Sequence, residues 1–267
     1  MRKGIVALAL VVLAASQAAL AQVPASVFLE DLTSPELAAA VAAGTTTILI
    51  PVGGTEQNGP HMVLGKHNVR AKVLAGRIAR ELGNALVAPV IAYVPEGDVK
   101  PPTGHMRYPG TITVPADVYR KTLDAAARSL KLAGFRDIVF LGDHGDYQKD
   151  NELVAHKLNR EWARTPVRAH ALVEYYRAAS DGFARNLKAR GYADAEIGLH
   201  AGLADTSLAM AVDPGLVRSA QLQSAPGSAA VGVSGDARRA SADLGKTGVD
   251  AIVIQSVAAI RAATVHR

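Results

Sequence analysis

The 267-residue chain contains no cysteine, and 49% of its residues are hydrophobic. Its stability must therefore come from an apolar core rather than from disulfide bonds, and its length suits one large α/β domain. The formal net charge of +5 is spread along the chain without a long block of Lys and Arg, which argues against nucleic-acid binding.

The first 21 residues have the pattern of a secretory signal peptide. Arg2 and Lys3 form a short basic segment, an apolar run covers residues 5–15, and residues 19–21 (Ala-Leu-Ala) form a cleavage site. A retained membrane anchor is the alternative, but the apolar run is short for a bilayer. We therefore expect export to the periplasm or the extracellular space, with a mature chain that begins near Gln22 and carries no membrane segment.

Strand and helix patterns alternate along the rest of the chain. Apolar runs rich in β-branched residues, or bounded by Gly and Pro, predict strands at residues 47–52, 86–94, 137–141 and 167–173. Apolar side chains at helical spacing predict helices at residues 69–82, 115–133 and 151–163. Asn68 stands where it can cap the first of these helices. Leu153, Leu158 and Trp162 of the third are expected in the core.

This alternation predicts the fold class. Strands separated by helices favour a mostly parallel sheet, because parallel neighbours need long crossover connections. The expected fold is a single three-layer α/β domain over residues 22–267, with helices on both faces of the sheet. Residues 95–110 and 221–236 are rich in Pro, Gly or Ser and are expected to be loops. Ligands in such a fold bind beyond the carboxyl ends of the strands.

Two polar clusters directly follow predicted strands. Residues 53–61 are Gly-Gly-Thr-Glu-Gln-Asn-Gly-Pro-His, and residues 142–146 are Gly-Asp-His-Gly-Asp. If the strands are neighbours, both clusters lie at one edge of the sheet. Glu56, His67 and His144 are ligand types for zinc and other divalent ions, and three such ligands with one open position are typical of catalytic sites. The alternative is that they only hydrogen-bond within their loops.

Four segments, in this order, resemble the creatininase family of metal-dependent amidohydrolases over most of the mature chain. Residues 56–61 (Glu-Gln-Asn-Gly-Pro-His) are similar to the family's Glu-Gln-His-Gly-Pro-His, and residues 108–111 (Tyr-Pro-Gly-Thr) to its Phe-Pro-Gly-Thr. Residues 143–146 (Asp-His-Gly-Asp) stand where members have Gly-His and then Gly-Gly or an acidic residue. Residues 200–207 contain His-Ala-Gly and Asp-Thr-Ser, which resemble its His-Ala-Gly and Glu-Thr-Ser.

The resemblance implies metal-binding roles for individual residues. Glu56 and His144 match metal ligands, and His67 stands where the family's metal-bridging Asp is expected. Asn58 stands where many members have a ligating His, and Asp146 where some have a ligating Glu.

Two of these positions depart from the family pattern and leave the number of ions open. A carboxylate can bridge two ions through its two oxygens, whereas a neutral imidazole offers one lone pair to one ion. With His67 in place of Asp and Asn58 in place of His, a single ion is slightly favoured over the family's two-metal centre. Asp146 or Asp205 can supply a further ligand. Zinc is the expected metal, with manganese or iron as alternatives.

The implied reaction is hydrolysis of a carbon–nitrogen bond other than a peptide bond, for example in a small cyclic amide. His200 matches a catalytic histidine and is the expected proton carrier, with Asp205 or Asp146 as its partner. The backbone amides of Gly53-Gly54 are expected to help position the substrate carbonyl. His61 and His105 are expected to make hydrogen bonds within their own turn and loop.

Other functions remain open at this stage. Loss of the metal centre through Asn58 and His67 would leave an exported binding protein or an inactive relative. Two histidines and one carboxylate also suit ferrous iron in oxygen chemistry. Because members of the family often form hexamers, we expect a homo-oligomer that acts on a small-molecule amide.

Overall fold

The computed structural model describes residues 26–223 and 229–264. Its strands are β1 (Thr47–Val52), β2 (Ala85–Val87), β3 (Asp137–Gly142) and β4 (Arg168–Ala171). The helices are α1 (Ser34–Ala42), α2 (Lys66–Leu82), α3 (Ala116–Leu132), α4 (Gln148–Glu161), α5 (Val173–Arg177), α6 (Phe183–Ala189), α7 (Asp194–Ile197), α8 (Leu203–Val212), α9 (Ser219–Leu222) and α10 (Ala242–Thr264). The predicted signal peptide lies outside the described residues. Within them, no helix is both long and apolar enough to span a bilayer.

The strands pair in the order β2-β1-β3-β4, and all neighbours are parallel. Thr47 of β1 pairs with Asp137 of β3, and Val52 pairs with Gly142, so the two strands end at the same level. The chain passes from β1 to β2 on one side and returns to β3 on the other side. The loops after β1 and β3 therefore leave from the point where the strand order reverses, which is the usual ligand position in such sheets.

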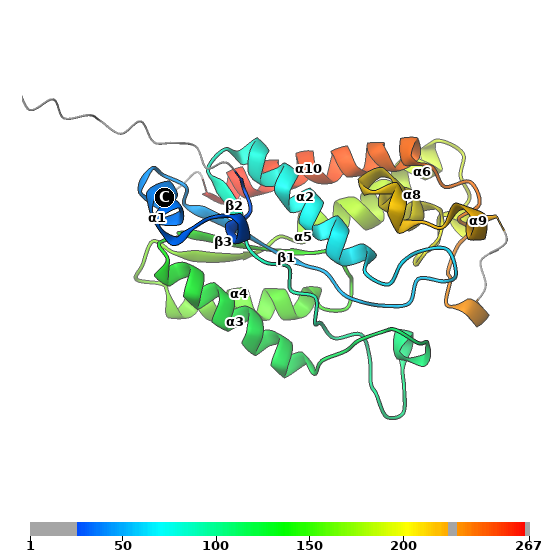
Figure 1. The fold of residues 1–267 in the computed structure, drawn as a ribbon, viewed down its shortest axis with the longest axis horizontal. Coiled ribbons are helices and arrows are strands. Elements are labelled where there is room, and N and C mark those ends of the chain that lie inside the picture. Colours follow the sequence, from blue (N-terminus) through cyan, green and yellow to red (C-terminus); the bar gives the residue numbers. More distant parts are fainter. Residues whose placement is uncertain (1–25, 224–228, 265–267) are drawn as a thin grey trace, which may run out of the picture.

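Helices cover both faces of the sheet. Alternate residues of β1 face opposite cores: Ile48 and Ile50 lie in the same buried cluster as residues of α3 and α4, whereas Leu49 lies in the cluster that includes residues of α2, α8 and α10. Figure 1 shows α2 and α10 above the sheet and α3 and α4 below it. The predicted three-layer α/β fold is thus confirmed.

Several predicted boundaries were wrong. The strand expected over residues 86–94 ends at Val87, two residues before Pro89, which has no N–H to donate to a neighbouring strand. The helix expected over residues 151–163 begins earlier, at Gln148. On that helix Leu158 and Trp162 are buried as expected, but Leu153 is 58% exposed because it lies on the opposite face.

Asn68 does not cap α2. The helix begins at Lys66 with Gly65 in the cap position. The Asn68 side chain instead holds the loop after β1: its Oδ1 accepts a hydrogen bond from the Gly54 N–H at 2.9 Å. A Cβ atom on Gly53 would lie 2.1 Å from this oxygen, so the close approach of α2 to the loop requires glycine there. Asn68 therefore helps to fix the segment that carries the site.

Candidate metal centre

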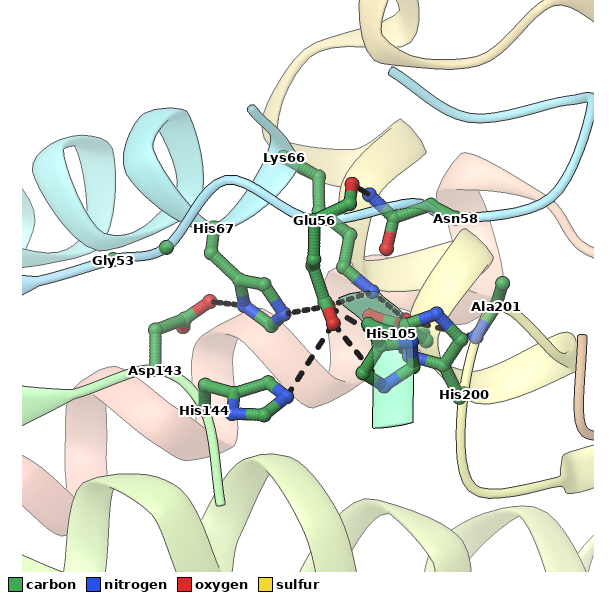
Figure 2. Close-up of polar contacts among 12 residues, drawn as sticks. Gly53, Glu56, Asn58, Lys66, His67, His105, Asp143, His144, His200 and Ala201 are labelled. Atoms are coloured by element: carbon green, nitrogen blue, oxygen red, sulfur yellow. Dashed lines mark hydrogen bonds and ion pairs between the residues drawn. The ribbon is translucent and has the colours of Figure 1, made fainter. Parts of the chain in front are cut away.

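The carboxylate of Glu56 forms the centre of the site. Glu56 follows β1 and is completely buried. Its Oε1 lies 2.8 Å from His67 Nε2, and its Oε2 lies 3.5 Å from His144 Nε2. Figure 2 shows the imidazoles of His67, His144 and His105 directed at this carboxylate. The structure thus brings together the three residues that the sequence singled out, with their ligand atoms within 4.8 Å of one another.

These residues fit a divalent cation. Bond lengths of about 2.0–2.2 Å place two ligand atoms of a tetrahedral zinc ion about 3.3 Å apart. This distance lies between the 2.8 Å from Glu56 Oε1 to His67 Nε2 and the 3.5 Å from Glu56 Oε2 to His144 Nε2. Asp143 Oδ2 lies 2.5 Å from His67 Nδ1, and Glu56 Oε1 lies 2.8 Å from His67 Nε2, so each ring nitrogen of His67 contacts a carboxylate. A histidine held in this way by a carboxylate is typical of metal ligands. Glu56 Oε2 has no hydrogen-bond partner among the described residues.

Buried charges surround this centre in a closed cycle, called here the charge ring. Its members, in order of contact, are Glu56, Lys66, Asp205, Arg70, Asp143 and His67. Arg70 donates to Asp205 Oδ1 at 2.7 Å and to Asp143 at 2.9 Å, and the Lys66 ammonium donates to the second oxygen of Asp205. Lys66 and Arg70 are four residues apart on α2 and so lie on one face of the helix.

The cations of the charge ring keep its carboxylates ionised. Burial opposes ionisation of Glu56, but the charge of Lys66 and the imidazoles of His144 and His67 hold its pKa well below the ordinary range. Burial also opposes ionisation of Asp205, yet Lys66 and Arg70 together hold the pKa of that carboxyl low. These carboxylates are therefore ionised at neutral pH and are suited to bind a cation.

His200 lies beside the centre in a neutral state. Its Nε2–H donates to the Gln57 carbonyl at 2.9 Å, which leaves the Nδ1 lone pair 3.7 Å from Glu56 Oε1. Burial, followed by the nearby charge of Lys66, lowers the pKa of His200 to about 3. At neutral pH this imidazole is therefore unprotonated, with its Nδ1 lone pair on the side of Glu56.

His105 lies in the site rather than only in its own loop. The Gln57 amide nitrogen donates to Gly232 O at 2.9 Å, and Gly59 N–H donates to the Gln57 amide oxygen at 3.0 Å. With the amide fixed in this orientation, its nitrogen also donates to His105 Nδ1 at 2.8 Å. The remaining His105 Nε2–H is directed at Glu56 Oε2, 3.3 Å away. His105 is thus a donor toward the central carboxylate.

Asn58 and the Gly53-Gly54 amides have structural roles. Asn58 is buried, and its amide nitrogen donates to the Glu56 and Val63 carbonyls at 2.9 Å each, which braces the loop. The Gly53 N–H donates to Ile91 O at 3.0 Å, and Gly54 N–H bonds Asn68. The expectation that these amides position a substrate carbonyl was therefore wrong.

His61 and Asp146 lie farther from Glu56. His61 Nε2 is 3.1 Å from Thr206 Oγ1 of α8, so this histidine joins two elements instead of closing its own turn. Asp146 is exposed, and its carboxylate lies within 4.8 Å of the ligand atoms of His144 and Glu96. Glu96, a fully buried residue that sequence reasoning missed, comes from the loop of residues 95–110, where no periodic pattern indicates which side chains point inward.

A pocket of about 320 Å³ opens beside the centre. Lys66, His67, His144 and His200 form its polar end, next to Asp205. The rest of its wall comes from residues after β4 and before α8, among them Tyr176, Ser180, Asp181, Ile197 and Leu199. A small molecule in this pocket can therefore reach the histidines of the centre.

The same arrangement of segments is found in known proteins. The sequence model of the creatininase family, described as creatinine amidohydrolase, matches residues 30–260. The chain belongs to the creatininase family. A solved creatininase structure named for manganese superposes on 90% of this chain and 99% of its own length, with a TM-score of 0.74 and 26% sequence identity.

Curated relatives of this creatininase-family chain match over shorter regions. Creatinine amidohydrolase of Pseudomonas putida is 33% identical over 119 residues, which are 45% of this chain and 45% of the relative. Mycofactocin precursor peptide peptidase of Mycolicibacterium smegmatis is 34% identical over 103 residues, 37% of this chain and 39% of the relative. The chain therefore spans less than half the length of the curated relatives that it matches.

Proposed function

We propose that this protein is a metal-dependent hydrolase that cleaves an amide-type carbon–nitrogen bond in a small molecule. The observation that carries this proposal is the buried Glu56 carboxylate, which lies between His67 Nε2 and His144 Nε2 and whose Oε2 has no hydrogen-bond partner among the described residues. Glu56, His67 and His144 would hold the ion, with zinc expected and manganese or iron as alternatives. A divalent ion in such a site makes water more acidic and polarises a carbonyl.

The side chains around the ion would handle protons and charge. His200 is neutral, and its Nδ1 is the nearest free base, so it would take a proton and pass it to the leaving nitrogen. Lys66 lines the pocket and would supply a fixed positive charge to a substrate oxygen that becomes more negative. Asp205 is bonded to Lys66 and Arg70, so it would orient these cations rather than act as a base.

The pocket volume supports a small substrate, because about 300 Å³ is near the lower limit for ligand sites. A small cyclic amide is the substrate class that we propose. The relatives include both a creatinine amidohydrolase and a peptide peptidase. Substrate assays should therefore compare creatinine and other cyclic amides with short linear peptides.

The deciding experiment measures metal content and hydrolysis together. Protein purified without chelator should contain about one ion per chain, and Glu56→Ala and His67→Ala should lose both the ion and at least about 100-fold of the activity. His156→Ala, at an exposed histidine of α4, is the matched control. Wild-type protein that binds no zinc, manganese or iron would contradict the proposal and favour a binding role.

We further propose that the protein is exported and acts as a homo-oligomer on substrates outside the cytoplasm. The pattern of residues 1–21 supports export. Light scattering tests the second point, and a monomer at working concentration would refute it.

A further inference from the structure

Glu96 is a buried carboxylate without a hydrogen-bond partner in the described part of the chain. The residue is 1% exposed, and neither of its side-chain oxygens has a hydrogen-bond partner among the described residues. A buried carboxylate without donors is costly, and proteins retain such a group where it binds a cation or a proton. Consistent with this, burial, and then the neighbouring charge of Glu56, raise the pKa of Glu96 to about 8 against the opposing effect of His144.

The backbone around Glu96 holds its carboxylate next to the metal centre. The Glu96 N–H donates to Thr113 Oγ1 at 3.0 Å, and the Thr113 hydroxyl donates to the Gly97 carbonyl at 3.0 Å. Glu96 Oε2 lies 3.8 Å from His144 Nε2. On the other side, a Cβ atom on Gly54 would lie 2.6 Å from Glu96 Oε1, so the glycine after β1 leaves the space that this carboxylate occupies.

The charges of the site leave a deficit that one divalent cation would balance. Three buried carboxylates and one partly buried carboxylate face two buried cationic side chains here. The buried carboxylates are Glu56, Glu96 and Asp143, the partly buried one is Asp205, and the cations are Lys66 and Arg70. With all of them ionised and the histidines neutral, two negative charges remain. One divalent ion balances these two charges.

We propose that Glu96 is a ligand of the same divalent ion that His144 binds. Its carboxylate adds a negatively charged ligand, whereas Asn58 offers only a neutral amide oxygen. Glu96, His144 and Asp146 each place one ligand atom within 4.8 Å of the others, so two carboxylates and one imidazole are available to that ion. Such a mixed set suits zinc or manganese. This inference rests on the proposed metal centre and adds a ligand that none of the four sequence motifs contains.

The test is the affinity of the metal-free protein for Mn²⁺, measured by titration calorimetry for wild type, Glu96→Gln and the exposed control Glu152→Gln. Glu96→Gln keeps the shape of the side chain and removes a buried charge, so it should fold. We expect one Mn²⁺ per chain in all three proteins, bound at least about tenfold more weakly by Glu96→Gln alone. The visible spectrum of bound Co²⁺ should also change in Glu96→Gln, because a ligand atom is exchanged.

The outcomes separate this inference from the proposed function. If Glu96→Gln binds Mn²⁺ with an affinity within twofold of that of wild type and gives the same Co²⁺ spectrum, Glu96 is not a ligand. The proposed centre of Glu56, His67 and His144 is then unaffected. Wild-type protein that binds neither ion overturns both. A Glu96→Gln variant that keeps metal affinity but loses turnover also contradicts ligation, since it would identify Glu96 as a proton donor.

Discussion

Two clusters of charged side chains in this molecule are built from the same residue types under opposite conditions. The charge ring is buried at the carboxyl ends of β1 and β3, and the Arg70 side chain within it is 4% exposed. On the outer surface of α3 and α4, a second cluster, called here the surface network, contains Asp124, Arg128, Lys157 and Glu161. There Arg128 is 44% exposed and contacts Asp124 at 2.8 Å and Glu161 at 2.5 Å.

The difference lies in what each cluster leaves unpaired. In the surface network the carboxylates contact cations and solvent screens the pairs, so each contact adds little stability. In the charge ring the side chains are 17% exposed or less, and removal of one member leaves a buried charge without compensation. Among the described residues, Glu56 Oε2 and both oxygens of Glu96 still lack a hydrogen-bond partner. Unsatisfied buried atoms, rather than the number of charges, therefore distinguish the candidate site from an ordinary ion-pair network.

The largest effect is expected from Arg70→Met. This change leaves Asp143 and Asp205 buried without their shared cation, so the free energy of unfolding should fall by about 3–5 kcal/mol. Urea unfolding followed by circular dichroism measures it. A loss below about 1 kcal/mol would show that the charge ring is no more sensitive than the surface network.

Glu96→Gln should stabilise the metal-free protein at high pH. Burial raises the pKa of Glu96 from its ordinary 4.5 to about 8, so the folded chain keeps a proton that the unfolded chain releases. The stabilisation that this proton gives the folded wild type is complete below pH 4.5 and is lost as the pH rises through 8. With a chelator present, the variant should gain a few kcal/mol over wild type between pH 4 and pH 9. Paired melting curves that stay parallel across this range would contradict the assignment.

Tyr175→Phe should have a moderate effect. The Tyr175 hydroxyl donates to Asp143 Oδ1 at 2.7 Å within the buried layer, and a lost hydrogen bond to a charged group costs about 1.5–3 kcal/mol. Tyr176→Phe, at the wall of the pocket, is the matched control, and its unfolding free energy should change less. Equal losses in the two variants would mean that the bond to Asp143 contributes nothing of its own.

The smallest effect is expected in the surface network. Arg128→Met should lower the free energy of unfolding by less than about 1 kcal/mol, and 1 M NaCl should reduce the difference further. Chemical unfolding with and without salt provides the measurement. A salt-independent loss as large as that of Arg70→Met would remove the contrast between the two clusters.

Most of the fold could be predicted from the sequence because buried strands and amphipathic helices have distinct apolar periods. β1 was predicted residue for residue, since the run of residues 47–52 is apolar or β-branched throughout. One kind of error arose where a single residue ends an element that the apolar pattern would continue, as Pro89 does after β2. Another arose where a polar side chain hydrogen-bonds a backbone group that is distant in the sequence. Asn68 is an example, because its bond to Gly54 depends on how α2 packs on the loop.

The candidate site was only partly accessible to sequence reasoning. Glu56 and His144 directly follow strands, so the topology of the sheet is enough to place them together, and His67 follows from the helix start. Glu96 and His105 come from an irregular loop whose path depends on tertiary contacts such as the bond from Thr111 to the His105 carbonyl. The Tyr-Pro-Gly-Thr segment was the available signal for that loop, and it marks His105 more directly than Glu96.

The parallel pairing of β1 with β3 also determines when the site can form during folding. It joins positions about 90 residues apart in the chain, with α2, β2 and α3 between them. Glu56 and His144 meet only after this long segment has closed, so the metal centre is among the late native contacts. An ion that binds only the complete centre therefore binds the native state and not earlier folding intermediates. It stabilises the native state alone.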